Sequence, residues 1–83
     1  MTREVLKEPI FAKEIVEITR FSHSIDEMKE KLKDYHENDI AQSLKYLNRA
    51  ERNLLYSAID AKWMAEIISY IDDPGQYVEE IGI

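Results

Sequence analysis

The feature that most constrains the fold is a row of three short amphipathic segments between His36 and Ile71, with almost no linker between them. In each segment, apolar residues recur every three or four positions, which places them on one face of a helix. The first and third segments resemble each other at an offset of 24 residues, through the pairs Ile40–Met64, Ala41–Ala65, Leu44–Ile68, Tyr46–Tyr70 and Leu47–Ile71. Such recurrence is typical of helix-hairpin arrays, although chance similarity between two amphipathic helices gives the same pattern.

Two further helices are expected before this row. Pro9 suits the first turn of a helix, and the apolar spacing predicts a helix from Pro9 to Phe21. Ser24 and Glu27 have the spacing of a capping box, which predicts a second helix from Ile25 to Asp34. The predicted buried faces are Phe11, Ile15 and Ile18, with Phe21 on the flank, and then Ile25, Met28, Leu32 and Tyr35.

Within the row itself, three residues are suited to begin helices. His36, Asn48 and Asp60 each precede a segment, where a side-chain acceptor satisfies a free backbone N–H. Asp39 would then lie at the third helical position, and Glu51 would complete a looser capping box. The predicted buried stripes are Ile40, Leu44 and Leu47; Leu54, Leu55, Ala58 and Ile59; and Met64, Ile67, Ile68 and Ile71.

A sixth helix is expected after the motif D-D-P-G-Q. Asp73 can cap it, Pro74 can take its first position and Gln76 can complete a capping box, with Tyr77, Val78 and Ile81 as the apolar set. The sequence ends at Ile83 after barely two turns, too few to bury much surface. We therefore expect the array to continue in a longer protein; a C-terminal helix that caps the array is the alternative.

These segments predict an all-α fold. Two glycines and two prolines in 83 residues argue against a turn-rich β protein, and the length allows one modest core. We expect a right-handed superhelix, a solenoid-like array of about five to six short helices. Residues 1–24 would form an N-terminal segment with one helix, and residues 25–83 the superhelix.

Composition excludes several classes of partner. The net charge of -6 and the absence of a basic stripe argue against nucleic acid and against an anionic membrane surface. No apolar run of about 18 residues and no signal peptide are present, so we expect no direct membrane insertion and a cytoplasmic location. The absence of cysteine rules out disulfides and thiol chemistry and fits a reducing compartment.

No enzymatic constellation is visible, so we expect no catalytic activity. His23 and His36 have no carboxylate or nucleophile at a spacing diagnostic of a triad or a zinc site, and their expected roles are an exposed loop and a helix cap. Gly75 and Gly82 cannot make a phosphate-binding loop. Trp63 lies off the apolar stripe of its segment, where it could pack on a neighbouring unit or anchor an interface.

Glu66 lies nearly opposite the buried stripe of the same segment. On composition alone it is a solvated glutamate, paired with Lys62 one turn earlier. Carboxylates on several faces make no metal site unless they converge, and a sequence does not show convergence.

The run from Leu32 to Ile71 resembles the intracellular N domain of MgtE-type magnesium transporters. The family pattern is a helix L-x-x-x-H-P-x-D-I-A-x-x-L-x-x-L, an acidic-basic helix, and then A-A-E-h-h-x-x-L, where h is apolar. The departures are Glu37 where proline is usual and Met64 where alanine is usual, and the resemblance covers about residues 25–83. The matching residues are His36, Asp39, Ile40, Ala41, Leu44 and Leu47, then Glu51, Arg52, Leu55 and Ile59, then Ala65, Glu66, Ile67, Ile68 and Ile71.

The resemblance implies a cytosolic regulatory domain that senses magnesium and gates a transporter. In that family a pair of CBS domains and a transmembrane domain follow in the same chain, which forms a homodimer. Mg²⁺ bridges the N domain and the CBS domains at high magnesium and holds the pore closed. Glu66 matches an N-domain glutamate used in this bridge, and the other acidic ligands lie beyond the end of this sequence, so the resemblance implies a weak, partial inter-domain Mg²⁺ site.

The alternative is a stand-alone α-helical module for protein–protein interaction. The middle helical domains of flagellar motor switch proteins have a similar superhelix and similar A-x-x-h-L patterns. Under this hypothesis magnesium has no role, and an apolar end of the superhelix binds a partner helix or a neighbouring subunit.

Overall fold

The computed structural model describes residues 10–82, and this part of the chain folds into helices without any strand. The all-α class and a count of about six helices are therefore confirmed, whereas the right-handed superhelix stays a prediction. A single 3₁₀ turn, η1, continues directly from the third helix. The elements are α1 (Ile10–Phe21), α2 (Ile25–Leu32), α3 (Glu37–Ser43), η1 (Leu44–Tyr46), α4 (Arg49–Ser57), α5 (Ala61–Ile68) and α6 (Gly75–Ile81).

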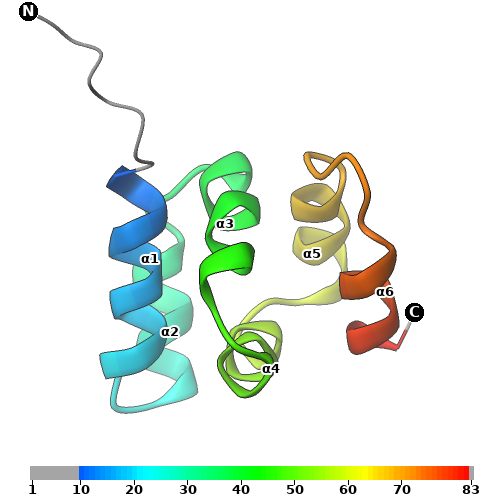
Figure 1. Ribbon diagram of the computed structural model, residues 1–83. Helices are drawn as coiled ribbons and strands as arrows, with labels where there is room; N and C mark the ends of the chain where they lie inside the picture. Colours follow the sequence, from blue (N-terminus) through cyan, green and yellow to red (C-terminus); the bar gives the residue numbers. More distant parts are fainter. Residues whose placement is uncertain (1–9, 83) are drawn as a thin grey trace, which may run out of the picture.

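The helices follow one another across the molecule in chain order (Figure 1). The pair α1 and α2 forms one end, α3 stands in the middle, and α5 and α6 form the other end, with α4 crossing below. The main neighbour of α1 is α3, and α3 in turn packs on α5. Helix α6 packs on α4 and lies at the far end of the row from α1 (Figure 1).

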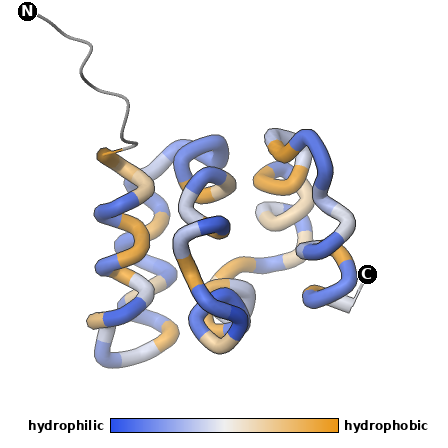
Figure 2. Tube along the Cα trace, in the orientation of Figure 1, coloured by the Kyte–Doolittle hydropathy of each residue, from blue (hydrophilic) through white to orange (hydrophobic). Residues whose placement is uncertain are grey.

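One hydrophobic core runs through α1 to α5. Hydrophobic and hydrophilic residues alternate along each helix, so that each has an apolar side to bury (Figure 2). Helix α1, which belongs to the predicted segment 1–24, contributes Ile15 and Val16 to this same core; the division at residue 24 stays a prediction. The buried members are Ile15, Val16, Met28, Leu32, Ile40, Ala41, Leu44, Leu47, Leu55, Ala58, Ile59, Met64 and Ile67.

Four of the five helix caps predicted from the sequence, those at the second to fifth helices, are confirmed. Each cap residue is extended and accepts a hydrogen bond from a backbone N–H of the first turn. At the second helix the glutamate expected to complete the box reaches one residue further back, to the N–H of His23. The cap bonds are Glu27 N to Ser24 Oγ (3.0 Å), Asn38 N to His36 Nδ1 (2.9 Å), Glu51 N to Asn48 Oδ1 (2.8 Å) and Trp63 N to Asp60 Oδ1 (2.8 Å).

The first two helices differ from the prediction in their faces and bounds. Phe11 is 54% exposed and Ile25 36% exposed, although both were expected in the core. Helix α1 instead turns Ala12, Ile15, Val16 and Thr19 inward. Helix α2 ends at Leu32 rather than Asp34, because the N–H groups of Asp34 and Tyr35 bond three residues back and tighten the last turn. The predicted start at Pro9 lies outside the described residues.

The sixth helix begins differently from the prediction. Pro74 itself is the N-cap residue, with no side-chain hydrogen bond, and the helix runs from Gly75. The expected cap by Asp73 and the box with Gln76 are therefore wrong. Pro74 has φ −84° and ψ 5°, which is not the extended geometry usual for an N-cap residue, and its ring has no acceptor to offer the first turn.

The predicted repeat is reproduced only in part. Ile40 and Met64 are both buried, and Tyr46 and Tyr70 are both 46% exposed. However, Ala41 is buried while its partner Ala65 is exposed. Helix α3 lies between α1 and α5, whereas α5 has α3 as its main neighbour, and this leaves part of its surface open.

Candidate functional site

Glu66 lies on the outward face of α5. The cap by Asp60 sets the start of this helix, and Met64 and Ile67 turn into the core with 3% and 0% exposure. At 100° per residue, Glu66 must then point away from the core, and its side chain is indeed exposed. The carboxylate of Glu66 is therefore accessible to solvent and to any surface that docks on α5.

The surroundings of Glu66 are open. The pairing expected with Lys62 is not among the ion pairs of residues 10–82; the backbone carbonyl of Glu66 accepts a hydrogen bond from Ser69 Oγ at 2.6 Å. Within the same residues, no group of three or more His, Asp or Glu side chains could hold a metal ion. Any cation held by Glu66 would need further ligands from water or from another surface.

The two histidines lie where the sequence suggested. The side chain of His23 is 92% exposed in the turn between α1 and α2, and its Nδ1 is 3.6 Å from Glu27 Oε1. His36 caps α3 and packs edge-on against Tyr70, with ring centroids 5.3 Å apart. His36 thereby joins the start of α3 to the end of α5, which is a structural role.

Trp63 is half-buried and packs against the core. It also lines a shallow hollow of about 280 Å³ at the meeting of α2, α3 and α5. Of the two roles considered for Trp63, packing is observed, and its exposed edge leaves an interface role open. The other lining residues are Lys29, Lys33, Tyr35, Glu37 and Asp60.

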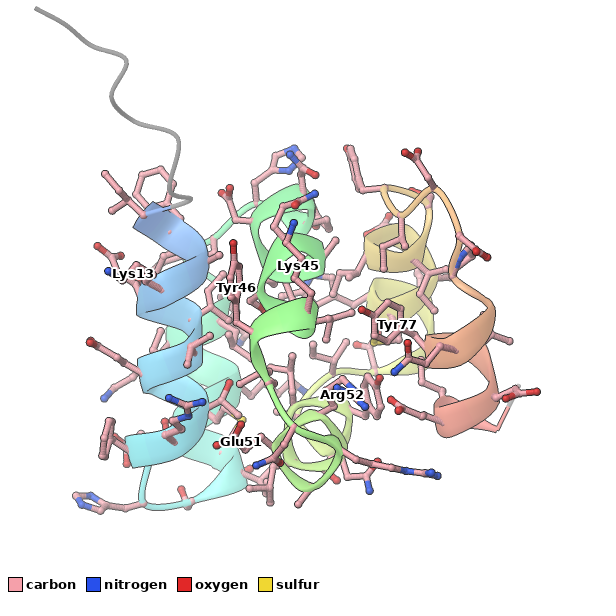
Figure 3. The ribbon with its side chains drawn as sticks, in the orientation of Figure 1. Lys13, Lys45, Tyr46, Glu51, Arg52 and Tyr77 are labelled. Atoms are coloured by element: carbon pink, nitrogen blue, oxygen red, sulfur yellow. The ribbon has the colours of Figure 1, made fainter. Side chains whose placement is uncertain are left out.

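Sequence reasoning missed a buried ionic network that joins α4 to α6. Arg52 on α4 grips both carboxylate oxygens of Glu80 on α6, at 2.8 Å from Nε and 2.6 Å from Nη2. Its Nη1 donates to the carbonyl of Leu47, and Tyr56 Oη donates to Glu80 at 2.7 Å. The guanidinium also lies over the ring of Tyr77, 5.8 Å from its centroid, between α4 and α6 (Figure 3).

The electrostatics of this α4–α6 network follow from these bonds. The Arg52 guanidinium, with the hydrogen bond from Tyr56, lowers the pKa of Glu80 to about 2 despite its burial. The Glu80 carboxylate in turn raises the pKa of Arg52, and burial raises the pKa of Tyr56. Glu80 therefore stays ionised, and Arg52 and Tyr56 stay protonated. The network acts as a structural clamp between α4 and α6 and not as a general acid or base.

The burial of Arg52 could have been predicted from its helical spacing. Arg52, Leu55 and Ile59 are spaced i, i+3 and i+7, and all three are buried. Leu54, which was expected on the inner face, is 48% exposed, so that prediction is wrong. Arg52 takes the inward position because Glu80 and the Leu47 carbonyl satisfy its buried donors.

A second set of polar bonds fastens α1. Arg20 Nε lies 2.8 Å from Glu51 Oε2, which joins α1 to the first turn of α4. Tyr35 Oη donates to Glu14 Oε1 at 2.7 Å, and this hydrogen bond raises the pKa of Tyr35 to about 12. These contacts lie at the surface and position α1 without forming a reactive site.

Comparisons with protein-family models, with curated protein sequences and with solved structures find no match to this chain. No helix within residues 10–82 is long and apolar enough to cross a membrane.

Proposed function

We propose that this chain is part of a cytosolic regulatory domain that senses magnesium and gates a magnesium transporter. The observation that carries the proposal is the exposed carboxylate of Glu66, without a side-chain partner among residues 10–82, in the segment that matches the family motif A-E-h-h. Its expected partners are the CBS domains and the transmembrane domain of the same full-length chain, in a homodimer.

The donor chemistry of Glu66 fits this role. Mg²⁺ prefers oxygen ligands, keeps several waters and commonly takes only one or two protein carboxylates. A bound ion would supply positive charge between two acidic surfaces. One carboxylate on α5 suits a partial site of this kind, completed by a surface outside this chain.

The charge around Glu66 supports the same role. Between Asp60 and Gly82 the sequence has six carboxylates and one lysine, whereas residues 10–59 have nine carboxylates and eight cations. An acidic surface repels a second acidic surface unless cations lie between them, so the docked state would be favoured when magnesium is abundant. This is a population shift caused by a ligand that prefers one of two states.

The test uses the protein that contains this chain together with the CBS pair. In Glu66→Ala, protection of that protein from protease should require several-fold more Mg²⁺, because one ligand of the bridge is lost. Glu79→Ala is the matched control, since it removes one exposed carboxylate from the same acidic stretch but not the proposed ligand. Equal protection of the wild type and Glu66→Ala would contradict the assignment.

The alternative is a stand-alone helical interaction module, and it is favoured by the large apolar side chains left exposed on α1 and α2. The reading frame after the codon for Ile83 distinguishes the two proposals. If it continues past Ile83 into a CBS pair and apolar spans of about 20 residues, the transporter proposal is favoured. A stop codon shortly after Ile83 would favour the interaction module.

A further inference from the structure

Apolar exposure is concentrated at the α1–α2 end of the molecule. Four of the seven large hydrophobic residues that are exposed lie on these two helices, and the other three are Tyr46, Leu54 and Tyr70. Phe21 is the most exposed of all, at 72%. Exposed apolar side chains gathered in one region of a molecule are a common mark of a binding surface. The four residues are Ile10, Phe11, Phe21 and Ile25.

A groove of about 360 Å³ runs along this end and is called here the α1–α2 groove. Its apolar surface comes from Ile18, Phe21 and Tyr35, and its charged residues are Glu14, Glu17 and Lys31. Phe11 lies beside it and packs edge-on against Tyr35, with ring centroids 6.1 Å apart. The groove thus combines apolar anchor points with a charged rim.

The uncompensated charge of the groove is negative. Lys31 is already paired with Glu27, 2.8 Å from its Nζ. Glu14 accepts a hydrogen bond from the Tyr35 hydroxyl. Because this hydroxyl is neutral, it does not cancel the negative charge of Glu14. The carboxylate of Glu17 makes no ion pair or hydrogen bond among residues 10–82, and the side chain is exposed. The two carboxylates lie on one helix face, beside the apolar surface.

We propose that the α1–α2 groove binds a cationic amphipathic helix of a partner protein. Apolar residues of the partner would cover Ile18 and Phe21, while its lysines or arginines would face Glu14 and Glu17. A second copy of this chain is a poor occupant, because each copy carries a net charge of -6 and the same acidic groove. This inference is independent of Glu66, which lies on α5.

The test measures binding of a fluorescein-labelled peptide, made of two copies of the heptad L-K-K-L-L-K-L, to the full 83-residue chain by fluorescence anisotropy. A matched peptide with glutamate in place of every lysine reports on charge. The wild-type chain should bind the lysine peptide and not the glutamate peptide. Failure to bind the lysine peptide would overturn the proposal.

Two substitutions, each with a matched control, test whether the peptide binds in the α1–α2 groove. Phe21→Ser and Glu17→Lys should each weaken binding of the lysine peptide by about tenfold, as expected for loss of an interface anchor or a charge pair. Leu54→Ser removes an exposed apolar side chain on α4, and Glu79→Lys makes the same change in net charge on α6; both should change affinity by less than about twofold. Circular dichroism of all four variants should show the wild-type helix content.

Two outcomes would overturn the proposal. If Glu79→Lys weakens binding as much as Glu17→Lys, the peptide follows net charge and not the groove. If sedimentation shows a dimer of the chain that Phe21→Ser dissociates, the groove binds a second copy instead.

Discussion

The two end helices of the structure are held against the same body by different forces. Helix α1 buries Ala12, Ile15, Val16 and Thr19 in the core. Helix α6 buries no residue fully, and its firmest attachment is the double hydrogen bond between Glu80 and Arg52. The difference teaches that a short helix with little apolar area can be fastened by one well-satisfied ionic network, whose loss should release that helix alone.

The largest expected effect is at the α1 end. Ile15 is fully buried, so Ile15→Ala should leave a cavity and cost about 2–5 kcal/mol of unfolding free energy. A chain of 83 residues is only marginally stable. We therefore expect all the helices to unfold together at a lower urea midpoint. Phe21→Ala, on the same helix but 72% exposed, is the control and should leave the midpoint almost unchanged. Loss of α1 alone, with the rest still folded, would contradict a shared core.

A smaller and local effect is expected at the α6 end. Glu80→Gln removes the counter-charge of Arg52, and we expect a loss of about 1–3 kcal/mol, from weakened bonds and a buried unpaired charge. Hydrogen exchange should quicken in α6 while α1 to α3 keep their protection. The control is Glu79→Gln, the neighbouring exposed glutamate. Equal loss of protection in all helices would show that α6 is an integral part of the core.

Acid should act on the same contact. Arg52 lowers the pKa of Glu80 to about 2 from an ordinary value of 4.5, so the ionised carboxylate stabilises the docked α6. That stabilisation is fully present above about pH 4.5 and is lost as the pH falls toward 2. NMR signals of α6 should therefore stay native at pH 5 and change below pH 4, and Glu80→Gln should lack this step. Release of α6 already at pH 5 would contradict the clamp.

The elements that the sequence predicted well are those that depend on local chemistry. Ser24, His36, Asn48 and Asp60 were identified as caps because a cap needs only a side-chain acceptor and a nearby N–H. The stripe of Ile40, Leu44 and Leu47 was also predicted and is buried, because α3 has neighbours on both sides.

What the sequence did not predict depends on which helices meet. Phe11 has the spacing of a core residue but lies on a face that no described helix covers. Arg52 was not among the residues of the predicted inner face, and only the return of α6 to α4, 28 residues later, makes its burial favourable. The position of Glu66 on an outward face could be predicted from periodicity, whereas the ligands that would accompany it could not.

The smallest expected effect lies between the two ends, at Glu66. Its side chain is exposed on α5 and touches neither the core nor the α4–α6 network, so Glu66→Gln should leave the urea midpoint unchanged within error. Protection of α6 from hydrogen exchange should also stay at the wild-type level, in contrast to Glu80→Gln. Any fall in stability would mean that Glu66 has a structural partner, and a loss of Mg²⁺-dependent protection in Glu66→Ala could then be a folding defect. An unchanged midpoint would assign such a loss to the ligand itself.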